Sequence, residues 1–202
     1  MHESRDEAVA RAAKFSPFLR DALQARPEIR DAFLGQGADA AAALALGDAN
    51  GDADARLRRQ RHGLALAVAL GDLSGQLPLE DVTRLLSDFA DSAIHTAVVT
   101  AIAERVPDAV PQGFTVVAMG KLGSRELNYS SDVDLLLLFD PQALPKRERE
   151  DATEAAVRIG RRMIGLLQKR TEHGYVARVD LRLRPSPEVT PIALPINAAI
   201  SH

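Results

Sequence analysis

The sequence contains no cysteine among its 202 residues. This absence excludes a disulfide framework, a thiolate nucleophile and any zinc or iron–sulfur site built on cysteine ligands. A metal ion bound by this chain must therefore be held by oxygen or imidazole ligands.

Long apolar runs and a large excess of one charge are also missing. The longest strongly apolar run, Val133 to Phe139, is far shorter than the about 20 residues that cross a bilayer. The opening segment, MHESRDEAVARAAKFSPF, lacks the apolar core of a signal peptide. The 25 Lys and Arg residues nearly balance the 28 Asp and Glu residues, which does not suggest a dedicated nucleic-acid-binding or membrane-surface protein. We expect a cytoplasmic protein with neither nucleic acid nor membrane as a partner.

The composition, with 46% hydrophobic and 26% charged residues, is that of a globular protein. Pro17 and Pro27 predict a series of short helices near the N-terminus, and one more short helix is expected within residues 35–55. Apolar periodicity predicts longer helices over 53–71 and 79–104. The basic side chains of the first of these could face an anionic ligand, but we favour a solvated helix face.

After Pro111 the pattern changes from helical to extended. Two apolar runs, Phe114–Met119 and Asp132–Phe139, predict neighbouring central strands, and residues 146–169 predict a covering helix. Residues 175–185 then alternate as one strand, which places four charged residues on one face: Arg178, Asp180, Arg182 and Arg184. The expected fold class is α+β, with an N-terminal helical region over residues 1–105 and a mixed sheet in a second domain over residues 106–202.

Asp132 and Asp134 form the central motif of the sequence. Because side chains at i and i+2 of a strand point to the same face, the two carboxylates lie close together. Their repulsion is tolerable when a cation lies between them or one is protonated. With oxygen ligands only, that cation would be hard, such as Mg²⁺ or Mn²⁺, and Asp180 offers a third carboxylate. A solvated strand end is the alternative interpretation of an isolated D-x-D motif.

A second motif, Gly120-Lys121-Leu122-Gly123, lies between the two predicted strands. Its backbone N–H groups and the Lys121 ammonium can converge on a phosphate. Neither a Walker loop nor a G-x-G-x-x-G motif is present. Arg182 and Arg184 carry planar guanidinium groups that suit phosphate. Together with the carboxylates, these residues predict metal-dependent nucleotidyl transfer.

Two segments resemble a known family. GKLGSRELNYSSDVDLLLLFD, from Gly120 to Asp140, and VDLRLRPSPEVTP, from Val179 to Pro191, are similar to the glutamine synthetase adenylyltransferase family. The resemblance covers about residues 53–202 and implies a nucleotidyltransferase fold like that of DNA polymerase beta, incomplete at its C-terminus. By motif position it implies that Asp132, Asp134 and Asp180 are catalytic metal ligands. It also implies phosphate or nucleotide binding by Gly120, Lys121, Gly123, Ser131, Arg182 and Arg184.

The activity implied by the resemblance is that of an ATP-binding, magnesium-dependent, multifunctional transferase that regulates nitrogen metabolism. ELNYSSD resembles the half that removes AMP from an adenylylated tyrosine of glutamine synthetase by phosphorolysis, which yields ADP. The implied partners are glutamine synthetase, phosphate, the nucleotides ADP, ATP and AMP, and a PII-type signalling protein. The alternatives are the adenylylating half of the same family, a non-catalytic fragment that binds nucleotide or glutamine synthetase, and a uridylyltransferase acting on a signalling protein.

Three further residues have two interpretations each. No motif surrounds His95 or His173, so a surface or structural histidine is favoured over a general base. Tyr129 could stack on a nucleotide base or could pack beside the sheet.

Overall fold

The structure is a computed structural model that describes residues 4–200 and contains both helices and a mixed sheet. The presence of both helices and a mixed sheet confirms the expected α+β class. The chain divides into two compact units. The first contains the residues up to Phe89 and the segments Glu126–Tyr129 and Glu172–Gly174, and the second contains the rest. The domain boundary expected after residue 105 stays a prediction.

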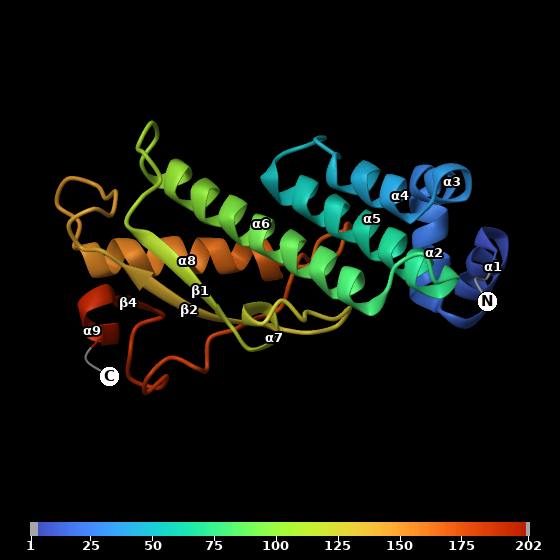
Figure 1. The fold of residues 1–202 in the computed structure, drawn as a ribbon. Coiled ribbons are helices and arrows are strands. Elements are labelled where there is room, and N and C mark those ends of the chain that lie inside the picture. The colour runs from blue at the N-terminus through green and yellow to red at the C-terminus, as the bar shows by residue number, and fades with distance from the viewer. Residues whose placement is uncertain (1–3, 201–202) are drawn as a thin grey trace. The chain divides into compact units, whose positions relative to one another are not determined.

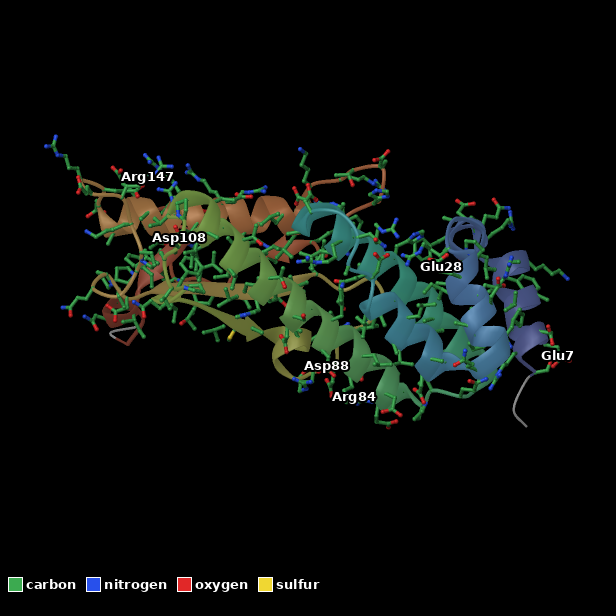
Figure 2. All side chains as sticks on the ribbon, turned by 90° about the horizontal axis from the view of Figure 1, so that it is seen from above. Glu7, Glu28, Arg84, Asp88, Asp108 and Arg147 are labelled. Carbon is green, nitrogen blue, oxygen red and sulfur yellow. The ribbon has the colours of Figure 1, made fainter. Side chains whose placement is uncertain are left out.

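Among the described residues, four short helices and one long helix build most of the first unit (Figure 1). They are α1 (Arg5–Phe15), α2 (Pro17–Ala25), α3 (Pro27–Gln36), α4 (Ala38–Leu46) and α5 (Ala53–Ser74), followed by the start of α6 (Leu79–Arg105). Pro17 and Pro27 open new helices, as predicted, because the missing N–H of proline costs nothing at a first helical position. Ser4 and Glu7, the latter labelled in Figure 2, form a capping box that starts α1.

Helix α5 contains a buried charge in the first unit. Leu57, Leu64 and Val68 are buried, as its periodicity predicts. Arg58 is also fully buried, and its guanidinium donates to the backbone oxygens of Asp54, at 2.7 Å, and Gly174, at 3.2 Å. The prediction of a solvated basic face was therefore wrong for Arg58, because these carbonyls supply the hydrogen bonds that water would otherwise make.

Helix α6 is the one helix within residues 4–200 that is long and apolar enough to cross a membrane by length and composition alone. Within its most apolar window 44% of the residues are buried in the protein. One such helix is weak evidence for a membrane span, because a core helix of a soluble protein passes the same test. Polar residues interrupt this helix, so it contains no long continuous apolar run in the sequence.

The second unit is built on a sheet in which β2 (Val133–Phe139) pairs on both sides. Strand β1 (Phe114–Met119) pairs with one edge of β2 in the antiparallel direction. The short strands β3 (Val179–Asp180) and β4 (Ala193–Pro195) pair with β2 in parallel. The strands β1 and β2 are neighbours, as predicted. Only β2 is central, however, because β1 pairs with no other strand in the described part of the chain.

Helix α8 (Ala152–Gln168) covers one face of this sheet (Figure 1). Val133, Leu135, Leu137 and Phe139 of β2 are fully buried, and Gly160 of α8 lies against Leu137. Asp134, Leu136 and Leu138 alternate with them and are only half-buried. The sheet therefore has one face covered by helix and one more open face, and Asp134 belongs to the open face.

Two predicted elements are shorter than expected. Helix α8 begins at Ala152 instead of residue 146, because the Asp151 carboxylate accepts from the N–H groups of Thr153 and Glu154 and so caps the helix there. The strand predicted over residues 175–185 pairs only at Val179 and Asp180. The Asp180 carboxylate accepts from the N–H of Arg182 at 2.8 Å, which is a turn interaction, and the chain leaves the sheet.

Candidate active site

Asp134 and Asp180 are paired positions on the neighbouring parallel strands β2 and β3. Paired residues of adjacent strands point to the same face, and adjacent strands lie about 4.8 Å apart. Asp132 lies two residues before Asp134, where the chain enters β2. The backbone therefore brings the three predicted carboxylates to one end of the open sheet face.

Gly120 lies directly against the Asp134 carboxylate. It begins the one-turn helix α7 (Gly120–Gly123) and has a φ of +54°. A Cβ atom added to Gly120 would meet Oδ2 of Asp134 at a distance that real Cβ atoms essentially never show. At the other end of α7, a Cβ on Gly123 would lie 2.7 Å from the Ala118 oxygen of β1. Both glycines thus allow the turn to lie close to the strands.

Asp132 pairs with Arg178, a residue that the motif analysis did not assign to the site. Nε of Arg178 donates to Oδ1 of Asp132, and Nη2 donates to the backbone oxygen of Ser130 at 2.5 Å. The carboxylate raises the pKa of Arg178, first by its hydrogen bond and then by its charge. Arg178 could have been found from its sequence position, because it lies two residues before Asp180 on the same strand face.

Asp180 pairs with Arg182. Nε of Arg182 lies 2.8 Å from Oδ2 of Asp180, and the hydrogen bonds from the Arg182 side chain and backbone lower the pKa of Asp180. The pKa of Arg182 is raised, mainly by its hydrogen bond to Asp180 and to a smaller extent by the charges of Asp134 and Asp132. The Arg182 guanidinium therefore contacts Asp180 directly and also experiences the charges of the other two carboxylates.

The remaining predicted site residues differ in their surroundings. Lys121 is exposed on α7, and Ser131 is half-buried immediately before Asp132. Arg184 donates to the backbone oxygens of Leu181, at 2.7 Å, and Pro187, at 2.6 Å. Two of its donors thus stabilise the turn that follows β3, which the single-strand prediction did not anticipate.

The carboxylates suit an oxygen-liganded divalent cation in chemistry and in backbone position. Asp134 and Asp180 face the same side from adjacent strands, and Gly120 leaves room for the Asp134 carboxylate. Asp132 and Asp180, however, are directed to arginine side chains. Within the described residues, no three His, Cys, Asp or Glu side chains form a group that could hold a metal ion. The three-carboxylate metal site stays a prediction.

His95 and His173, the two histidines considered as general bases, lie outside the sequence motifs of the three carboxylates and have other neighbours. His95 lines a groove of about 190 Å³ with Asp91, Ile94 and Val98 of α6 and Phe114, Val116 and Ala118 of β1. Val116 and Ala118 pair with Leu137 and Leu135, so this groove lies on the face opposite to Asp134. His173 is exposed beside Glu172. Neither placement favours a general base at the carboxylates.

Tyr129 is a partly packed residue. Tyr129 is 40% exposed, and its hydroxyl donates to the Asp72 carboxylate of α5 at 3.1 Å. Burial raises the pKa of Tyr129, and the negative charge of Asp72 raises it further. The phenol therefore remains protonated and acts as a hydrogen-bond donor at neutral pH.

Comparison with known proteins identifies the family to which the chain belongs. The family described as glutamate-ammonia ligase adenylyltransferase matches residues 7–202. The chain therefore belongs to this family, which confirms the resemblance carried by its motifs.

Individual relatives agree with this membership. Three of them are named bifunctional glutamine synthetase adenylyltransferase/adenylyl-removing enzymes. The protein of Mesorhizobium japonicum is 38% identical over 98% of this chain. The Rhizobium meliloti protein is 42% identical over 95% of the chain, and the Caulobacter vibrioides protein 42% identical over 69%. The chain spans about a quarter of the length of the first two relatives, at 24% and 22%.

Proposed function

We propose that this chain is a cytoplasmic nucleotidyltransferase core of the DNA polymerase beta type that removes AMP from an adenylylated tyrosine of glutamine synthetase. The observation that carries the proposal is the placement of Asp134 and Asp180 on paired strand positions, with Asp132 two residues away and Gly120 against Asp134. Membership of the adenylyltransferase family supports the same reaction class.

The proposed reaction is phosphorolysis. An oxygen of inorganic phosphate attacks the phosphorus of the AMP group, a new P–O–P linkage forms ADP, and the bond between that phosphorus and the tyrosine oxygen breaks. The tyrosine oxygen leaves and takes a proton. The direction is proposed because ELNYSSD, residues 126–132, resembles the removing half of the family.

The residues have distinct tasks in this reaction. Asp132, Asp134 and Asp180 would hold Mg²⁺ or Mn²⁺, which when bound neutralises charge on the phosphate oxygens. Lys121 on the α7 turn is exposed and would bind the attacking phosphate. Arg182 is 85% exposed at its side chain and lies beside the carboxylates, where it would bind a second phosphate group. Of these residues, Lys121, Asp132 and Arg182 are exposed to solvent.

The test is incubation of the chain with adenylylated glutamine synthetase, phosphate and Mg²⁺, with ADP and the deadenylylated glutamine synthetase measured together. We expect ADP to form with the wild type, not with Asp134→Asn, and to form normally with Asp140→Asn at the other end of β2. Incorporation of AMP from ATP into unmodified glutamine synthetase would instead establish the adenylylating direction. Magnesium-dependent nucleotide binding with neither reaction would favour a binding fragment.

A further inference from the structure

Arg178 holds the segment that leads into β2 by three separate hydrogen bonds. Its side chain donates to the Asp132 carboxylate and to the Ser130 backbone oxygen. Its own backbone oxygen accepts from the N–H of Val133 at 2.8 Å. One residue of the β3 segment thus binds three of the four consecutive residues 130–133.

This segment has no regular structure of its own. The ladder between β2 and β3 begins at Val133, and Ser130 to Asp132 precede it as irregular chain. The Asp132 side chain is 47% exposed, and Arg178 is its only hydrogen-bond partner among the described residues. Without Arg178, the Asp132 carboxylate would have no hydrogen-bond partner among the described residues, and its backbone, unlike that of Asp134, is not paired in the ladder.

We propose that Arg178 is a positioning residue that fixes the direction of the Asp132 carboxylate relative to Asp134. This inference rests on the proposed function, since it concerns a carboxylate assigned there to metal binding. A planar guanidinium reaches an acid and a carbonyl at once, which sets a direction as well as neutralising a charge. Residues that orient metal ligands in this way typically change metal affinity by about 10- to 100-fold.

If Arg178 only stabilised the fold, its loss would lower the unfolding temperature, whereas a positioning role predicts weaker metal binding with little change in stability. The Arg178 side chain is 51% exposed, and exposed ion pairs add little to folding stability. Loss of Arg178 should therefore leave the unfolding temperature almost unchanged while it weakens metal binding. Measurements of metal affinity and of local hydrogen exchange, compared with the unfolding temperature, therefore distinguish a positioning role from a structural one.

The experiment compares Arg178→Gln and Arg178→Lys with Arg170→Gln, an exposed arginine that makes no hydrogen bond or ion pair within the described residues. Mn²⁺ affinity is measured by electron paramagnetic resonance, and amide hydrogen exchange is followed over residues 130–133. We expect Arg178→Gln to weaken Mn²⁺ binding about tenfold or more and to accelerate exchange there. Arg178→Lys should be intermediate, because an ammonium neutralises Asp132 but cannot reproduce the planar two-bond geometry. Arg170→Gln should behave as the wild type.

Other outcomes would overturn the inference. Equal Mn²⁺ affinity and equal exchange in Arg178→Gln and Arg170→Gln would show that Arg178 positions nothing. Tighter Mn²⁺ binding in Arg178→Gln would make Arg178 a competitor of the cation, and faster exchange throughout the chain would indicate a general stability effect. If the wild type binds no Mn²⁺, the proposed function fails, and the exchange of residues 130–133 alone decides whether Arg178 fixes the segment.

Discussion

Gly120 and Asp134 lie so close together that no side chain larger than hydrogen fits at position 120 without displacing the Asp134 carboxylate. The two residues belong to separate sequence motifs, one assigned to phosphate and one to metal. Because these two residues are in contact, the two motifs lie next to each other on the open face of the sheet.

Gly120→Ala should lower the adenylyl-removing activity at least about tenfold, because the added Cβ displaces the Asp134 carboxylate from its position. Its φ of +54° adds roughly 1–2 kcal/mol of strain for a residue with a side chain. Activity and thermal unfolding check the two effects separately. Gly165→Ala on α8, where an added Cβ meets nothing within 4 Å, is the control and should retain activity. Full activity in Gly120→Ala would contradict the contact.

We expect protonation of Glu150 to lower the stability of the fold at acid pH. Burial by itself would raise the pKa of this carboxyl, but hydrogen bonds from the Arg105 side chain and the Arg147 N–H outweigh it, and the pKa is lowered. Arg147 is labelled in Figure 2. Because the folded pKa is the lower one, the stabilisation is present above the unfolded value of about 4.3 and is lost as pH falls through the folded pKa.

Glu150→Gln should therefore be less stable than the wild type at pH about 7, by roughly 3 kcal/mol, with the difference shrinking below pH about 4. Thermal unfolding of both proteins between pH about 3 and about 7 measures this difference in stability. Glu148→Gln, at an exposed neighbouring position, should follow the wild-type curve. A constant difference between Glu150→Gln and the wild type at every pH would exclude the titration of Glu150 as the cause.

Arg58→Met should lower the free energy of unfolding by roughly 2–4 kcal/mol, because the carbonyl oxygens of Asp54 and Gly174 lose their donor and the Asp54 carboxylate loses its ion pair. Urea unfolding gives this difference. Arg56→Met on the same helix removes a side chain that makes no hydrogen bond within the described residues, and it should change stability by less than about 0.5 kcal/mol. Equal midpoints for the two variants would show that burial of Arg58 is not stabilised by these bonds.

Two substitutions of Tyr129 distinguish stacking of its ring on a nucleotide base from packing of the ring within the protein. Tyr129→Phe should cost about 1 kcal/mol through loss of the bond to Asp72, and Tyr129→Ala should cost more, since it also removes the half-buried ring. We expect both variants to keep the nucleotide affinity of the wild type, measured by calorimetry. Weaker nucleotide binding in Tyr129→Ala, with normal binding in Tyr129→Phe, would instead identify the ring as a stacking surface.

Arg184→Lys should loosen the turn after β3 without a large change in the KM for phosphate. The guanidinium bridges the Leu181 and Pro187 oxygens, and a single ammonium cannot reproduce that fork. Hydrogen exchange over residues 181–190 and steady-state kinetics check the two parts. Arg161→Lys, an exposed position on α8, is the control. A raised KM for phosphate with unchanged exchange would restore the phosphate-binding role predicted from the motif.

The sequence by itself determined the elements whose signals are local. Proline at first helical positions predicted the starts of α2 and α3, and the β-branched and apolar run from Phe114 to Met119 predicted β1 with its observed bounds. It also determined the family, because the motifs from Gly120 to Asp140 are contiguous in the chain. These features depend on neighbours in sequence, and periodicity and backbone chemistry report them directly.

Tertiary structure decided which charged residues meet. Alternation placed Arg178, Asp180, Arg182 and Arg184 on one strand face, yet only Val179 and Asp180 pair with β2, and the turn directs Arg184 to backbone oxygens. The sequence pattern suggested a solvated charge at Arg58, but in the structure Arg58 is buried and donates to the backbone oxygen of Gly174, which is far along the chain. Such pairings depend on strand register and on contacts between distant segments. A local sequence pattern does not predict strand register or contacts between distant segments. Every residue has a backbone carbonyl, so the residue type at position 174 does not indicate that its carbonyl accepts from Arg58.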